Sequence, residues 1–146
     1  MAQDHCRRRT RAVSDRAVAD ELEVRNVIAR LAQLADDGDL DEYVSLFTAD
    51  AEWLIPGNHR IGHDVIRSGA VERREQGVTG PGSGTRHVIS TISVVVAGDE
   101  ATAKSYYQYY GDTATKPTLR MMGHYQDRFV RTPDGWKLAR REAFPG

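Results

Sequence analysis

Apolar residues in the first half of the chain follow a helical period. Between about Asp20 and Gly38 they recur at steps of three and four residues, which predicts one long amphipathic helix. A second, short helix is expected over residues 40–47, with Asp39 or Asp41 as its N-cap. Residues 62–76 repeat the helical spacing and predict a third helix.

Strand-like patterns occur between the second and third predicted helices and again after the third. Residues 51–55 and 59–61 flank the turn residues Pro56-Gly57-Asn58 and predict a hairpin. Four later runs are rich in β-branched and aromatic residues and predict an antiparallel meander: residues 86–97, 101–110, 121–131 and 136–143. Helices followed by a long antiparallel sheet indicate an α+β fold in which one sheet face packs on the helices.

A glycine-rich segment over residues 77–84 joins the third helix to the meander. Loops of this composition are flexible and often border ligand cavities, and a plain connector is equally consistent with the pattern. No Gly-Lys-Ser/Thr follows, so the segment is not a phosphate-binding loop.

Composition and charge narrow the class of protein. The chain has 146 residues with 20 Lys+Arg and 21 Asp+Glu, which fits one domain and disfavours nucleic acid as a partner. Its longest apolar run, residues 94–97, is far below the ~20 residues of a membrane-spanning helix, and no signal peptide is visible, so we expect a cytoplasmic protein. The single Cys6 indicates neither a disulfide nor a thiolate metal site.

Residues 1–17 differ from the rest of the chain because they are rich in arginine and poor in apolar side chains. We expect them to form a disordered basic leader before a single domain over residues 18–146. An arm that recruits an acidic partner such as nucleic acid is the alternative, and it predicts salt-dependent binding that is lost when the leader is deleted.

Two residues far apart in sequence are candidates for acid–base chemistry. Asp36 continues the apolar side of the first helix, so it is either paired near the core or solvated in the last turn. His87, near the start of a long strand, shares a face with Ile89 and Thr91 if the alternation holds, and it is either a core residue or a catalyst. If the two side chains meet, Asp36 would orient the imidazole and make it a general base.

Aromatic residues indicate either core packing or the wall of a pocket for a ring-shaped ligand. Tyr107 and Tyr109 share one face of their strand, and Trp53 and Ile55 share one face of the hairpin. Of the neighbours His124 and Tyr125, only one points inward.

The remaining polar residues include one arginine that is expected inside the fold. Arg140 and Arg141 face opposite ways, so one is expected inside, where it needs an anion such as Asp36 or developing charge on a substrate. His59 and His63 lack ligand partners, so we expect no zinc site, and no serine stands in a nucleophile elbow.

Several of these segments together resemble a known family. The segments LADDGDLDEYVSLFTADAEW (34–53), Arg86-His87, GHYQDRFVR (123–131) and WKLARR (136–141) look like the SnoaL-like branch of the nuclear-transport-factor-2-like superfamily, over about residues 20–145. The resemblance implies a cone-shaped α+β barrel, with N-terminal helices packed on a strongly curved, mostly antiparallel sheet around a deep apolar pocket.

Within that branch the chain looks most like cofactor-independent lyases, such as hexachlorocyclohexane dehydrochlorinase, bile acid dehydratase and scytalone dehydratase. The resemblance implies that Asp36, His87 and Arg141 are the catalytic residues. It implies that the substrate pocket contains Leu31, Trp53, Ile55, Tyr107, Tyr109, Tyr125 and Ala143. One departure is Leu31, because these lyases carry a lysine or tyrosine at that position, which helps the leaving group depart.

The sequence therefore predicts a cofactor-free lyase or isomerase that acts on a small apolar cyclic substrate, without a metal. A non-catalytic ligand-binding or assembly module is the alternative, with Asp36 and His87 as a structural ion pair. Because many aromatics lie on the sheet, we also expect a homo-oligomer, either a dimer or a trimer.

Overall fold

The computed structural model describes residues 14–146. The first helix, α1 (Asp15–Asp37), is capped by Ser14, whose side chain accepts a hydrogen bond from the Ala17 backbone at 3.1 Å. It begins earlier than the predicted start near Asp20, so the last residues assigned to the basic leader form its first turn. The rest of that leader, residues 1–13 with Cys6, lies outside the described residues.

Two shorter helices follow α1. The helix α2 (Leu40–Ser45) is capped by Asp39, which accepts from the Glu42 backbone at 2.8 Å, and α3 covers His63–Glu75. The second helix is shorter than predicted because Phe47 already starts the first strand. None of the helices described over residues 14–146 is long and apolar enough to cross a membrane.

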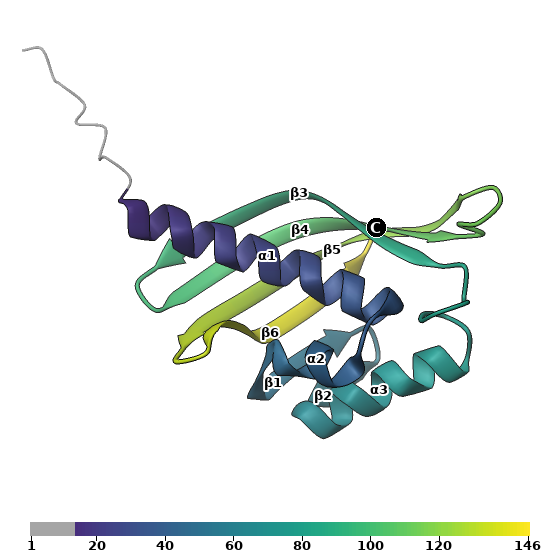
Figure 1. Ribbon diagram of the computed structural model, residues 1–146, viewed down its shortest axis with the longest axis horizontal. Coiled ribbons are helices and arrows are strands. Elements are labelled where there is room, and N and C mark those ends of the chain that lie inside the picture. Colours follow the sequence, from purple (N-terminus) through teal and green to yellow (C-terminus); the bar gives the residue numbers. More distant parts are fainter. Residues whose placement is uncertain (1–13) are drawn as a thin grey trace, which may run out of the picture.

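Six strands form one sheet (Figure 1). They are β1 (Phe47–Ile55), β2 (Asn58–Ile61), β3 (Arg86–Ala97), β4 (Glu100–Gly111), β5 (Thr118–Thr132) and β6 (Gly135–Pro145). Their order is β2-β1-β6-β5-β4-β3, and every neighbouring pair is antiparallel except β1 and β6. The predicted hairpin and meander are therefore confirmed, and the parallel β1–β6 pair joins them.

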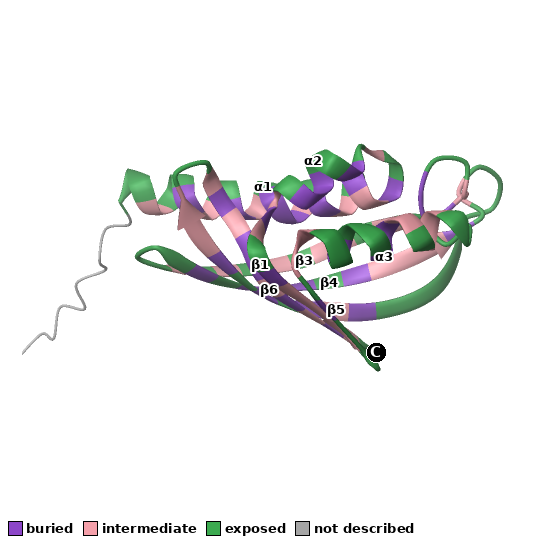
Figure 2. Cartoon of the chain, turned by 90° about the horizontal axis from the view of Figure 1, so that it is seen from below, coloured by how far each residue is buried: buried purple, intermediate pink, exposed green. Residues whose placement is uncertain are grey.

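The helices cover one side of this curved sheet (Figure 2). The apolar side of α1 is buried through Val24, Ile28, Leu31 and Leu34. It packs on β3 and β6, whereas α3 packs on α2 and the β1–β2 hairpin. This arrangement confirms the α+β class, with N-terminal helices on a curved, mostly antiparallel sheet.

Two irregularities decide which side chains face the helices. In β3 the register shifts between Ser90 and Ile92, and Thr91 has a φ of 45°. His87 and Ile89 therefore point inward before this bulge, and Ile92 points inward after it. The expectation that Thr91 shares the His87 face is wrong, because a bulge inserts one unpaired residue and reverses the alternation.

The second irregularity lies in β6. There the register shifts so that Leu138 pairs with Phe129 and Arg140 with Arg128, which leaves Ala139 as the extra residue. Leu138, Ala139 and Arg141 are all buried. The bulge thus places Arg141 on the inner face of the sheet, whereas Arg140 remains half-exposed on the outer side.

Candidate active site

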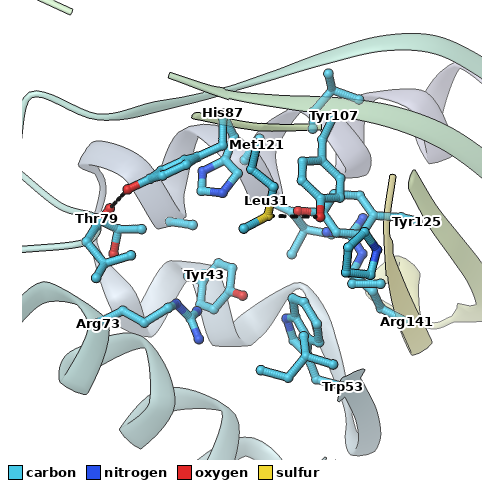
Figure 3. Close-up of a pocket in the computed structure, with 18 of the residues that line it drawn as sticks. Leu31, Tyr43, Trp53, Arg73, Thr79, His87, Tyr107, Met121, Tyr125 and Arg141 are labelled. Carbon is cyan, nitrogen blue, oxygen red and sulfur yellow. Dashed lines mark hydrogen bonds between the residues drawn. The ribbon is translucent and has the colours of Figure 1, made fainter. Parts of the chain in front are cut away.

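A cavity of about 330 Å³ lies between the C-terminal ends of the three helices and the inner face of the sheet (Figure 3). Its size is at the lower end of ligand pockets, which span ~300–1,000 Å³. The seven residues that the sequence assigned to the pocket all line it: Leu31, Trp53, Ile55, Tyr107, Tyr109, Tyr125 and Ala143. His87 and Arg141 line it too, so the structure brings together segments from the whole length of the chain.

Asp36 and His87 form a close, doubly hydrogen-bonded contact at this cavity. Asp36 Oδ1 lies 2.7 Å from His87 Nδ1, and Asp36 Oδ2 accepts the backbone N–H of His87, also at 2.7 Å. A carboxylate can only accept, so Nδ1 carries a proton, and in the neutral ring Nε2 is then the acceptor. The Asp36 side chain is 6% exposed and that of His87 is 21% exposed. The contacts with Asp36 therefore hold the His87 ring in one orientation at the cavity wall.

The last turn of α1 is held in place from outside the helix. Arg74 Nη2 donates to the carbonyl of Leu34 at 2.9 Å, which also accepts the backbone N–H of Gly38, and to the carbonyl of Gly38 at 2.6 Å. A Cβ on Gly38 would lie 2.5 Å from Leu34 Cδ2, so the chain can leave α1 this closely only at a glycine. These contacts fix the turn that carries Asp36.

Aromatic side chains on the inner face of the sheet form the cavity wall next to the His87 imidazole. Tyr107 and Tyr125 stack with ring centroids 4.6 Å apart, and Trp53 meets Tyr125 edge-on at 6.2 Å. Gly123 leaves room for the Tyr107 ring, because a Cβ there would come within 2.5 Å of the Tyr107 hydroxyl. The His87 ring lies 4.9 Å from Tyr109, whose hydroxyl donates to the Val78 carbonyl at 2.6 Å.

The two stacked phenols are hydrogen-bond donors at neutral pH. Burial raises the pKa of Tyr125, although the nearby Arg141 acts in the opposite direction, and burial raises the pKa of Tyr107 as well. The Tyr107 hydroxyl contacts only Met121 Sδ, at 3.6 Å, and no residue in the described part of the chain accepts from Tyr125. The Tyr125 O–H is thus free to donate to a polar atom of a ligand, and the Tyr107 O–H has only a weak sulfur acceptor that such an atom would replace.

Arg141 is committed to a partner that the sequence did not identify. Its Nε and Nη2 each donate to a carboxylate oxygen of Asp127 at 2.8 Å, and its guanidinium lies 4.0 Å over the Tyr125 ring. Burial opposes its charged form, but the attraction of Asp127 outweighs burial and holds the pKa of Arg141 above its usual range. The anion for the interior arginine is therefore Asp127, not Asp36.

Further residues line the cavity that the sequence did not single out. They are Ala32, Ala35, Tyr43, Pro56, Arg73, Val78, Thr79, Ile89, Met121 and Pro145. Val78 and Thr79 belong to the glycine-rich segment 77–84, which borders the cavity as a loop of this kind often does. No comparable signal marked Arg73, because it stands in a charged stretch of α3 that is typical of a solvated face.

The other histidines within residues 14–146 lie away from this cavity. His63 Nε2 hydrogen-bonds to the Phe47 carbonyl at 2.9 Å, and His59 lies 3.4 Å from Glu52. His124 stacks on Phe144 at 4.8 Å, while its neighbour Tyr125 points inward. Over residues 14–146, no three His, Cys, Asp or Glu side chains are placed to hold a metal ion together.

Known proteins that are similar to this chain include a sequence relative and solved structures. Uncharacterized protein Rv2910c of Mycobacterium tuberculosis is 28% identical over 128 residues, which cover 85% of this chain and 84% of that protein. An NTF2-like protein with a cystatin-like fold from Novosphingobium aromaticivorans is 27% identical and superposes with a TM-score of 0.79, covering 88% of this chain and 82% of its own.

A second similar structure, named provisionally as a scytalone dehydratase of the same bacterium, has a TM-score of 0.70 at 20% identity, covering 88% of this chain and 85% of its own. At that identity the likeness shows the fold alone. The profile of the SnoaL-like domain matches residues 16–142, which span the helices, the sheet and the cavity described above. The chain therefore belongs to the SnoaL-like domain family.

Proposed function

We propose that this protein is a cofactor-independent lyase or isomerase that removes a proton from carbon in a small cyclic substrate, with His87 as the general base. The observation that carries the proposal is the 2.7 Å contact between Asp36 Oδ1 and His87 Nδ1 at the wall of an apolar cavity. It leaves Nε2 as the basic atom on the cavity side. Asp36 would stabilise the imidazolium that forms when Nε2 accepts the proton.

The groups opposite His87 suit the charge that leaves the carbon. As the C–H bond breaks, its electron pair moves towards a leaving group or a carbonyl oxygen, which needs hydrogen-bond donors. Tyr107 and Tyr125 supply neutral O–H donors, and burial keeps them protonated. Arg141 acts through Tyr125, because two of its nitrogens are already bound to Asp127.

The test uses 5-nitrobenzisoxazole, a small bicyclic compound whose decomposition reports a general base directly. The base takes the proton from the ring carbon next to nitrogen, the C–H electrons form the nitrile, and the N–O bond breaks to release a coloured phenolate. We expect turnover in the wild type, and a loss of about 10²-fold or more in His87→Ala and Asp36→Asn, since one general base contributes ~10²–10⁴-fold.

The matched control is His59→Ala, which removes a half-exposed histidine outside the cavity and should leave the rate unchanged. Circular dichroism of each variant checks that the chain remains folded. If His87→Ala, once folded, eliminates the compound at the wild-type rate, His87 is not the base and the proposal fails.

A binding module of the same fold is the second candidate, and Leu31 favours it. This side chain is only 1% exposed and contributes no polar atom at the position where similar lyases carry lysine or tyrosine. In that case wild type and His87→Ala would bind cyclic ligands equally, and neither would accelerate the elimination.

A further inference from the structure

We infer that the ligand of this cavity carries a carboxylate, and that Arg73 binds this group on the side opposite His87. The inference rests on the proposed function, because it names the substrate class of the same site. It starts from an imbalance of polar groups around the cavity, which offers hydrogen-bond donors that the protein itself does not use.

Arg73 is the first of these donors. It stands in the last turn of α3, and its half-buried side chain reaches into the cavity beside Tyr43, across from His87 (Figure 3). Its neighbours on α3 are occupied: Arg74 binds carbonyls of α1, and Arg67 Nε lies 2.8 Å from Asp41. Within residues 14–146, the Arg73 side chain makes no hydrogen bond or ion pair, although its backbone carbonyl accepts from Val78 at 2.9 Å.

A second arginine makes the surroundings of Arg73 more positive. Arg60 on β2 is 9% exposed, and its guanidinium packs against Gly69 of α3, where a Cβ would come 2.5 Å from Arg60 Cζ. Burial, and after it the positive charge of Arg73, lower the pKa of Arg60, while Glu72 and Tyr43 act in the opposite direction. The described carboxylates form no ion pair with Arg60 either. An anion from outside the chain would balance this charge.

Trp53 supplies an independent observation on the same side of the cavity. Its Nε1 is buried and has no hydrogen-bond acceptor in the part of the chain that the structure describes. The ring lies beside Tyr43 in the cavity wall, and its strand partner is Arg60 (Figure 3). A buried N–H without an acceptor is costly, so a ligand oxygen at this place would gain affinity from it.

The two donors together select the chemical class of the ligand. A guanidinium presents paired N–H groups that match the two oxygens of a carboxylate, and the remaining wall is aliphatic and aromatic. A flat ring system with one carboxylate fits these surroundings. With its carboxylate on Arg73, the opposite edge of the ring faces the His87 imidazole.

The experiment compares 2-naphthoate with the neutral 2-naphthamide by isothermal titration calorimetry. We expect the wild type to prefer naphthoate by at least about tenfold, since a hydrogen bond to a charged group is worth about 10- to 100-fold in affinity. Arg73→Gln should lose that preference by weakening naphthoate and leaving naphthamide within about twofold. Arg73→Lys should retain part of it, and Trp53→Phe should weaken both compounds.

Arg67→Gln is the matched control, because it removes an exposed arginine of the same helix whose partner is Asp41. It should change neither affinity. Equal affinities of the two compounds for the wild type, an equal loss of both in Arg73→Gln, or binding of neither compound would overturn the inference.

The two proposals fail in different ways. If His87 is not a base, elimination of 5-nitrobenzisoxazole is unaffected by His87→Ala, but that variant still prefers naphthoate. If the carboxylate site is wrong, the naphthoate preference is absent while elimination still depends on His87.

Discussion

The buried pair of Asp127 and Arg141 allows a quantitative prediction. The two residues are cross-strand partners on β5 and β6, joined by two hydrogen bonds of 2.8 Å. The Asp127 side chain is 0% exposed and that of Arg141 is 7% exposed. Water can therefore replace neither partner once the other is removed.

Removal of one charged side chain leaves the other charge buried without a partner. We expect Asp127→Leu, which leaves a buried guanidinium, and Arg141→Met, which leaves a buried carboxylate, each to lower the free energy of unfolding by ~3–5 kcal/mol. The double variant removes both charges together with their desolvation cost. Its loss should be far smaller than the sum of the single losses, because apolar replacement of a buried ion pair is often close to neutral.

The assay is urea unfolding of the four proteins of this double-mutant cycle, at one pH and one protein concentration. Asp41 and Arg67 form the control cycle, since their side chains are 78% and 46% exposed and such a pair is worth only ~0–1 kcal/mol. The reasoning is refuted if Asp127→Leu is no more harmful than Asp41→Leu, or if the double variant loses the sum of both single effects.

Two further predictions concern other contacts of α1. Arg74→Met should lower the free energy of unfolding by ~1–3 kcal/mol and slow the elimination that we propose for His87, because the turn that carries Asp36 loses its external donor; urea midpoints and initial rates test both effects. Hydrogen bonds from Arg131 and then Trp136 lower the pKa of Asp20 from its ordinary value of 3.8 to about 2. Their stabilisation is complete above the ordinary value and is lost as the pH falls through about 2, so Asp20→Asn should flatten the acid side of a plot of urea midpoint against pH.

Local patterns in the sequence predicted most of the secondary structure. The helical period of α1, the Asp39 cap of α2 and the turn at Pro56-Gly57-Asn58 each depend on residues close together in the chain. The same holds for the strands of the meander, whose observed bounds extend the predicted ones by a few residues at most. Local stereochemistry decides these features, so one sequence suffices to find them.

The candidate site could be predicted only in part. Asp36 and His87 were recognised as candidates from their positions and from the family resemblance, and the structure places them in contact. Asp127 as the partner of Arg141 was missed, because that pairing depends on the register of β5 against β6. Arg73 was missed because a charged helix segment looks the same in sequence whether it faces solvent or a cavity.

The sequence by itself determined the succession of helices and strands, the α+β class and the candidate residues for acid–base chemistry. The tertiary structure decided which of them meet. Strict alternation from Trp136 and Leu138 would have put Arg140 inside, and the bulge at Ala139 puts Arg141 there instead. The physical reason is that bulges and strand register depend on the curvature of the whole sheet, which no short stretch of residues specifies.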